Sequence, residues 1–265
     1  MIIAASSIHV TVGEVAAALA LVAIAAVASR AWHAGLEEDI GIAVVRSLIQ
    51  LTAIGYVITL IFDQDSAALV LALITVMVVF GAFTARHRAS HVPNAFWPLL
   101  ASLAVAAAAT LGLVIALGIF PATPRYLVPV GGMVIGNSMT AAAVALNRLG
   151  EDVHEQSRKI EATLALGATS SQAVTPLVRR GLRSGMITLV DSTKTTGLIF
   201  FPGTMVGMLL AGAEPIDAVR LQLILLYTLL GSVSLAALVA TGLAYRNFFT
   251  AAHQLKDLPP AARER

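Results

Sequence analysis

Long apolar runs alternate with short polar intervals over most of this chain. A run of about 20 apolar residues is the length that a helix needs to cross the roughly 30 Å hydrocarbon core of a membrane. The pattern therefore predicts an all-α, polytopic membrane helix bundle of about seven transmembrane helices. Residues 185–212 are the least regular span, because they include Asp191, Lys194 and a Phe-Pro-Gly break, and a re-entrant segment is the alternative there. The predicted spans cover residues 10–29, 40–62, 66–85, 96–119, 127–147, 185–212 and 219–245.

The spans predict a single transmembrane domain over residues 1–247, followed by a cytoplasmic tail over 248–265. The one long polar interval, residues 148–184, begins with a charged continuation of the fifth span. Its second half is small, half-apolar and interrupted by Gly167 and Pro176. A glycine allows the backbone angles of a bend, and a proline starts a helical turn more easily than it continues one. We therefore expect two short helices with a bend between them rather than a helix lying on lipid headgroups.

The basic residues predict how the chain is oriented in the membrane. Seven spans place 13 of the 17 Lys and Arg residues on one side and only Arg125 and Arg220 on the other, with Arg46 and Lys194 inside spans. Cytoplasmic loops carry the excess of basic residues. The N-terminus is therefore expected outside and the C-terminus in the cytoplasm. The larger group comprises Arg30, Arg86, Arg88, Arg148, Arg158, Lys159, Arg179, Arg180, Arg183, Arg246, Lys256, Arg263 and Arg265.

Composition agrees with lipid as the solvent. The chain is 58% hydrophobic and 12% charged, with a mean hydropathy of +0.86, whereas soluble domains carry about 25% charged residues. It has no cysteine, which excludes disulfides and thiolate metal sites. The net charge is only +2 and the basic residues form no single face, so no nucleic-acid partner is expected.

Glu161-Ala162, followed by Gly167-Ala168, is the most informative motif of the polar interval. It resembles the Glu-Ala-Ala-x-x-x-Gly loop of ABC-transporter membrane subunits. Thr163 replaces the second alanine, and the proline that usually ends the motif comes early. The resemblance implies that residues 148–184 hold a coupling helix that docks on a cytoplasmic ABC ATPase subunit, with Glu161, Ala162, Gly167 and Ala168 at the contact.

Three blocks in this order extend the resemblance over most of the chain. They are similar to the FetB-type iron-export permeases and to the plant aluminium-tolerance permeases of the same family. This similarity implies a homodimeric permease of the cytoplasmic membrane that exports a metal ion with a separate ATP-hydrolysing subunit. The blocks are Gly131 to Thr140, Glu161 to Ala168, and Asp191 to Thr195 with Phe201 to Gly203.

The chain lacks the residues for hydrolysing ATP as a P-loop enzyme. A Walker A loop ends in Gly-Lys-Ser/Thr, but the only Lys-Thr pair, Lys194-Thr195, has no preceding glycine and lies within a span. We therefore expect no enzyme activity and no cofactor in this chain, with ATP and Mg²⁺ on the partner.

Polar residues inside the spans are candidates for a translocation path. A charge near the bilayer centre costs roughly 2.5–3.5 kcal/mol, so it usually faces a partner or water. Asp191 and Lys194, one turn apart, form either a self-neutralising pair or part of the path. Asn137 and Ser138 either line a cavity or belong to a helix contact made by Gly132-x-x-x-Gly136, a spacing repeated at Gly203-x-x-x-Gly207.

Arg46 and Gln50, one turn apart in the second span, form another polar stripe, although Arg46 is close enough to the span's start to snorkel. No metal ligand set is evident. The rival interpretation is a stand-alone secondary transporter that uses Asp191 and Lys194 as a proton relay. Another is an ABC permease for a sugar nucleotide or other solute.

Overall fold

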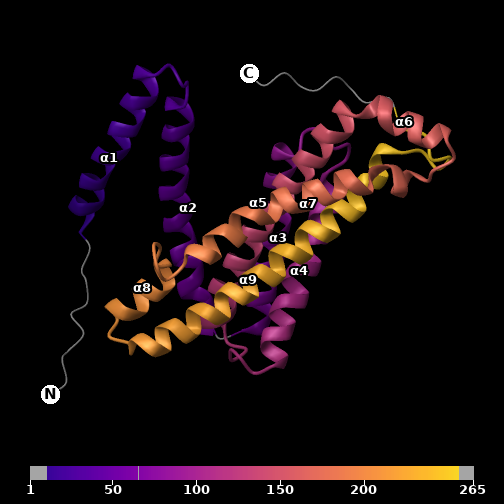
Figure 1. Ribbon diagram of the computed structural model, residues 1–265. Coiled ribbons are helices and arrows are strands. Elements are labelled where there is room, and N and C mark those ends of the chain that lie inside the picture. Colours follow the sequence, from indigo (N-terminus) through magenta and orange to yellow (C-terminus); the bar gives the residue numbers. More distant parts are fainter. Residues whose placement is uncertain (1–10, 65, 257–265) are drawn as a thin grey trace. The chain divides into compact units, whose positions relative to one another are not determined.

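The computed structural model describes residues 11–64 and 66–256, and the regular elements in those ranges are all helices (Figure 1). The predicted all-α helical bundle is confirmed. The helices form two compact units, with α1 and α2 in the first and the helices from α3 onward in the second.

In the first unit, α1 (Val12–Ala31) and α2 (Glu37–Gln64) are apolar on most of their surface. The first helix begins at Thr11, whose hydroxyl accepts a hydrogen bond from the backbone N–H of Glu14. The Glu14 carboxylate in turn accepts one from the Thr11 backbone N–H at 2.7 Å. This reciprocal cap satisfies two N–H groups that the first helical turn leaves without partners.

The second unit is built around α5 (Pro124–Glu155), which packs against α3, α4, α7 and α9. The other elements of the unit are α3 (Ala67–Arg88), α4 (Phe96–Ala116), α6 (Ser157–Ala165), α7 (Ser170–Thr195), α8 (Gly203–Leu210), α9 (Pro215–Ala244) and the 3-10 helix η1 (Tyr245–Phe248).

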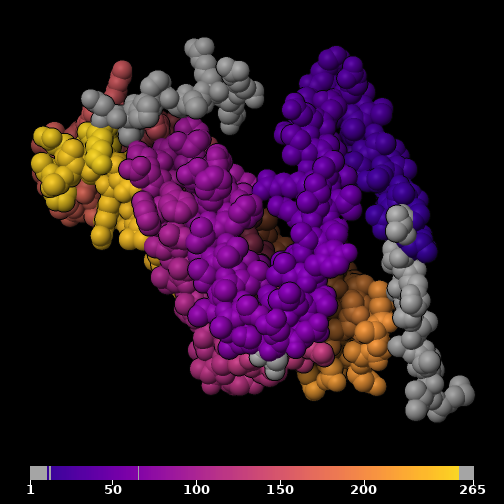
Figure 2. Space-filling model, turned by 180° about the vertical axis from the view of Figure 1, so that it is seen from behind, coloured from indigo at the N-terminus to yellow at the C-terminus, as the bar shows by residue number. Residues whose placement is uncertain are grey.

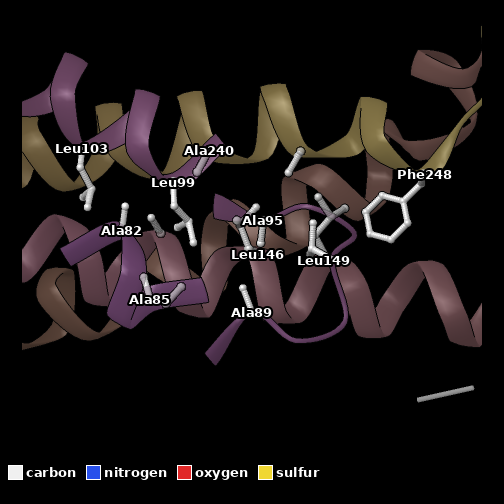
Figure 3. Packing of buried hydrophobic residues seen from close by; sticks show 14 of the residues in the cluster. Ala82, Ala85, Ala89, Ala95, Leu99, Leu103, Leu146, Leu149, Ala240 and Phe248 are labelled. Atoms are coloured by element: carbon white, nitrogen blue, oxygen red, sulfur yellow. The ribbon is translucent and has the colours of Figure 1, made fainter. Parts of the chain in front are cut away.

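Two buried apolar clusters mark the two ends of this unit. The loop-end cluster lies toward α6 and is shown in Figure 3; alanines such as Ala82 and Ala240 let the helices approach closely, while Phe248 fills the end. The far-end cluster lies at the other end of the same helices. The loop-end cluster includes Leu99, Leu103, Leu146, Leu149, Val153, Val174, Leu177, Ala240, Ala244 and Phe248; the far-end cluster consists of Leu111, Val114, Phe120, Val130, Val134, Leu225 and Leu229.

The clusters reveal the direction of each helix. The last part of α5 lies in the loop-end cluster and its first part in the far-end cluster. In α7 the order is reversed, because Leu177 packs at the loop end and Leu189 at the far end. In α9 it is reversed again, from Leu225 to Ala244. Helices α5 and α9 therefore both run from the far end to the loop end, and α7 runs in the opposite direction. Helices α5 and α9 lie parallel and side by side (Figure 1).

Six helices among the described residues are long and apolar enough to cross a membrane, and they coincide with six of the predicted spans. The interval predicted as a span over 185–212 is not one helix. There α7 ends at Thr195, a turn follows with Gly197 at φ +88°, and α8 begins at Gly203. The predicted seventh span is therefore divided between α7 and α8, and neither is among the six helices long and apolar enough to cross a membrane in the described residues.

The prediction for Pro176 was wrong. We expected a short helix to begin there, but α7 begins six residues earlier and continues through the proline. Thr169 determines the start, because its side chain and that of Gln172 form a reciprocal cap at the first turn.

Candidate functional site

The residues that resemble an ABC coupling helix lie on α6 and the turn after it, residues 156–169, which we call the α6 segment. Gln156 ends α5 with a non-helical backbone, so that α6 starts in a new direction. Ile160 is buried in the loop-end cluster and Leu164 packs against that cluster. These two apolar contacts hold α6 against the unit and leave Glu161 and Ala162 exposed.

The turn after α6 depends on Gly167. Its φ is +92°, a conformation that side-chain-bearing residues rarely adopt, and its N–H donates to the Leu164 carbonyl at 2.9 Å. The bend predicted at this glycine is confirmed. Leu166, the residue just before it, is 89% exposed and forms an apolar tip.

Three of the four predicted docking residues lie together. Glu161, Gly167 and Ala168 line an open groove of about 500 Å³, whose other wall is formed by residues 252–255. Ala162 is exposed on α6 but does not line this groove.

The α6 segment joins α5 to α7, and these two helices are in unusually close contact. A Cβ added to Gly181 would lie 2.7 Å from the Ala145 carbonyl oxygen, and one added to Gly185 would lie 2.5 Å from that of Ala141. Real Cβ atoms do not approach so closely, so only glycine allows these backbones to touch. Small residues four apart have this role at many membrane helix contacts.

This contact was missed in the sequence, where Gly132-x-x-x-Gly136 and Gly203-x-x-x-Gly207 were considered instead. A Cβ at Gly132 would meet only a flexible methionine, the Met77 Cε at 3.1 Å, and one at Gly136, Gly203 or Gly207 would meet nothing within 4 Å. The glycines that make the contact, Gly181 and Gly185, have the same four-residue spacing as the two pairs considered. They lie in an arginine-rich stretch of the sequence.

A buried carboxylate joins α5 to α7 beside this contact. Asp152 is 0% exposed, and its two oxygens lie 2.9 Å from Arg148 Nη2 and 3.5 Å from Arg180 Nε. Neither pair meets hydrogen-bond geometry, so the interaction is an ion pair between one buried anion and two half-exposed cations. It fixes the end of α5, and with it the start of the α6 segment, against α7.

The same end of α5 is bound to the loop between α3 and α4. His91 Nδ1 lies 3.0 Å from Asn147 Oδ1, and Asn147 Nδ2 donates to Glu151 at 2.7 Å. A Cβ at Gly150 would lie 2.6 Å from the His91 Cβ, so this loop also sits directly on the helix. The base of the α6 segment is therefore held from two sides.

The exposed side of α5 carries polar groups within the apolar part of the unit. Asn137 and Thr140 are exposed, and their side chains bond to carbonyls of their own helix, those of Met133 and Gly136. Val144, one turn further along the same side, lines a groove of about 280 Å³ together with Ser184 of α7. Ser138, in contrast, is fully buried with no hydrogen-bond partner for its hydroxyl.

Asp191 lies on the side of α7 that borders this exposed side of α5, because it follows Ser184 by two helical turns. Leu189, two residues earlier, packs in the far-end cluster, so Asp191 is level with the first half of α5. Its Oδ1 accepts a hydrogen bond from Lys194 Nζ at 2.9 Å, and the two side chains are 59% and 67% exposed. We call Asn137, Thr140, Ser184 and Asp191 the polar strip.

Arg46 and Gln50 lie on one side of α2, in the first unit, where they line an open groove of about 460 Å³ with apolar neighbours. Among the described residues, no group of three His, Asp or Glu side chains is placed to hold a metal ion.

Most of the chain matches one family. The model described as "Uncharacterised protein family (UPF0014)" covers residues 12–249. The rice (Oryza sativa subsp. japonica) "UPF0014 membrane protein STAR2" is 41% identical over 246 residues, which are 93% of this chain and 86% of the relative. "Protein ALUMINUM SENSITIVE 3" of Arabidopsis thaliana is 37% identical over 241 residues, 91% of this chain and 88% of the relative.

A bacterial relative matches at similar length. The "Probable iron export permease protein FetB" of Escherichia coli (strain K12) is 36% identical over 250 residues, 94% of this chain and 96% of the relative. No solved structure matches the chain. With a family model and full-length relatives in agreement, this multi-pass membrane protein belongs to the UPF0014 family.

Proposed function

We propose that this chain is the membrane permease subunit of an ABC transporter, driven by ATP that a separate cytoplasmic ATPase subunit hydrolyses. The observation that carries the proposal is the α6 segment. It is a short helix with a glycine-dependent bend, and it presents Glu161 and the 89% exposed Leu166 to its surroundings. A carboxylate beside an apolar tip suits docking into a groove that offers a basic rim and an apolar floor.

The packing of α5 and α7 supports a mechanical role for this segment. The α6 segment joins these two helices directly, and Gly181, Gly185 and Asp152 hold their backbones together. A displacement of α6 by the ATPase would therefore move both helices together, because close-packed interfaces shift as units and do not deform continuously. The same two helices carry the polar strip, which is the proposed translocation path.

The orientation follows from charge. Basic residues are concentrated at the loop end of the second unit, which the positive-inside rule assigns to the cytoplasm. The proposal therefore places the N-terminus outside and the C-terminus inside, in the cytoplasmic membrane. A second copy of the chain, forming a homodimer, would face the exposed side of α5 and α7 and enclose the path between two polar strips.

For the cargo, we propose a metal ion of the iron type, moved outward. The printed name of the Escherichia coli relative, a probable iron export permease, supports this choice. Carboxylate and amide oxygens, as on Asp191 and Asn137, suit hard cations better than soft ones. The proposed path also includes Lys194, and Arg46 and Gln50 on α2. Ser138 belongs to the proposed set as well, although its side chain is buried within α5's packed side.

Replacing Gly167 by proline tests the docking role. Proline fixes φ near −65°, which is incompatible with the +92° at this position, so the bend and the docking surface are lost. We expect the variant to reach the membrane, but stimulation of the partner's ATP hydrolysis by the purified permease to fall to the unstimulated rate. The control is Gly167→Asn, because asparagine tolerates positive φ, and it should keep stimulation. Normal coupling in the proline variant would refute the docking role.

Replacing Asp191 by asparagine tests the path. The side chain is 59% exposed, so folding and ATPase binding should remain normal, while the loss of a membrane-embedded charge should slow iron efflux about tenfold. Asp217 forms an i,i+3 ion pair of the same kind with Arg220 and provides the matched control Asp217→Asn. Equal efflux from both variants would remove Asp191 from the path.

The hydrogen-bonded Asp191–Lys194 pair also favours a second candidate, a stand-alone secondary transporter with a proton relay. Purified permease in liposomes separates the two. Metal flux that needs the ATPase and ATP supports our proposal, whereas flux driven by a pH gradient through this chain alone supports the second candidate.

A further inference from the structure

The described part of the chain after α9 is packed against the loop end of the second unit. Phe248, the last residue of η1, is 0% exposed, and Phe249 is 6% exposed. After them, the Thr250 N–H donates to the Gln254 carbonyl at 2.8 Å and the Lys256 N–H to the Phe248 carbonyl at 2.9 Å. Residues 249–255 therefore form a small hairpin, which we call the C-terminal hairpin.

This hairpin is attached to the elements that hold the α6 segment. His253 Nδ1 lies 2.9 Å from the hydroxyl of Ser170, the first residue of α7. On its other side, Asn247 Nδ2 donates to the Pro93 carbonyl at 2.9 Å, and Lys256 Nζ donates to the Asn247 carbonyl at 3.0 Å. Within the second unit, Figure 2 shows the yellow C-terminal residues next to red residues from the middle of the chain.

The hairpin and the α6 segment enclose one groove between them. Glu161, Ala165 and Gly167 lie on one wall, and Ala252, His253 and Gln254 lie on the other. The small side chains of the alanines leave space between the two walls. Among the described residues that line the groove, Glu161 is the one with a formal charge. The volume of about 500 Å³ is enough for several side chains of another polypeptide.

We infer that the C-terminal hairpin is the second wall of the ATPase docking site, so that the partner inserts a segment into the groove instead of touching α6 alone. This inference rests on the proposed function, because half of the groove consists of the proposed docking residues Glu161, Gly167 and Ala168. The lining of the groove favours a narrow segment of the ATPase that places a basic or hydrogen-bonding side chain next to Glu161. An anionic lipid headgroup is disfavoured by the same carboxylate.

The test compares two tryptophan variants of adjacent, exposed alanines in the full chain. Ala252 lines the groove, whereas Ala251 does not. The probe is the ATPase that copurifies with the permease and is identified by its Walker A peptide. Ala252→Trp should fill the groove and weaken binding of this ATPase about tenfold or more, while Ala251→Trp should bind like the unmodified chain.

A second measurement does not depend on how the tryptophan variants fold. The chain has no cysteine, so Ala252→Cys or Ala251→Cys provides a single thiol for maleimide labelling. Bound ATPase should protect position 252 and leave position 251 reactive. Protection of position 252 that depends only on permease concentration would assign the groove to a second copy, and protection relieved by deleting residues 257–265 would assign it to the chain's own end. Either result overturns the inference.

Different results contradict the docking role of the hairpin and the proposed function. If the unmodified chain binds the ATPase, Gly167→Pro does not, and position 252 is neither protected nor sensitive to tryptophan, the hairpin is not part of the site and the proposed function stands. If the unmodified chain recruits no ATPase, both are wrong.

Discussion

Leucine in place of Gly185 should strongly destabilise the protein. The added Cβ would lie 2.5 Å from the Ala141 carbonyl oxygen and 2.9 Å from the Ala145 Cβ, and the backbone of α5 cannot rotate away as a side chain can. Ordinary overpacking costs about 1–3 kcal/mol, and a clash with backbone lies at or above the upper end. At about 2–4 °C per kcal/mol, the Tm in detergent should fall by roughly 10 °C or more.

Gly112→Leu is the matched control. Gly112 is also inside a helix, α4, but it is exposed and a Cβ there would meet nothing within 4 Å. Because leucine has a better helix propensity than glycine, this variant should keep or slightly raise the Tm. A Gly185→Leu protein as stable as the control would show that α5 and α7 do not touch as described.

Removing both arginines that flank Asp152 should have an effect of similar size. The carboxylate is 0% exposed, so Arg148→Ala together with Arg180→Ala would leave a buried anion without a countercharge. Losing the partner of a buried ion costs about 3–5 kcal/mol. Each single variant should cost clearly less, because the other arginine remains and each arginine is partly solvated. Thermal unfolding of the four proteins in detergent measures the difference.

Neutralising Asp152 itself provides the control for that experiment. Asp152→Asn in the double-arginine background removes the buried charge and should recover most of the lost stability. If the triple variant is no more stable than the double variant, the cost arises from lost arginine packing and not from an unpaired carboxylate.

The membrane helices could be predicted from the sequence because lipid imposes a simple length rule. The six long apolar runs became helices whose ends lie close to those expected; the run predicted at 96–119, for example, forms α4 from Phe96 to Ala116. The bend at Gly167 was also predictable, since only the backbone of that residue is involved. Both features are local, and local chemistry determines them.

The contacts between helices could not be predicted in the same way. Gly-x-x-x-Gly occurs at three places that all have the same local signal, and only the tertiary structure brings another backbone to Gly181 and Gly185. Asp152 and Arg180 are far apart in the sequence and meet only because α7 runs antiparallel to α5. The C-terminal hairpin was assigned to a tail, because its attachment depends on Phe248 and Phe249 packing in the loop-end cluster, which is a tertiary contact.

The most direct test of the account uses Leu166, the exposed tip of the α6 segment. A single cysteine placed there in the cysteine-free chain can carry a short photoactivatable cross-linker in native membranes. We predict that the main cross-linked product contains the ATPase subunit and that its yield falls in the Gly167→Pro background. If the cross-linker reacts only with lipid, or if the cysteine is labelled by an impermeant reagent from outside the cell, the proposed coupling through this segment is contradicted.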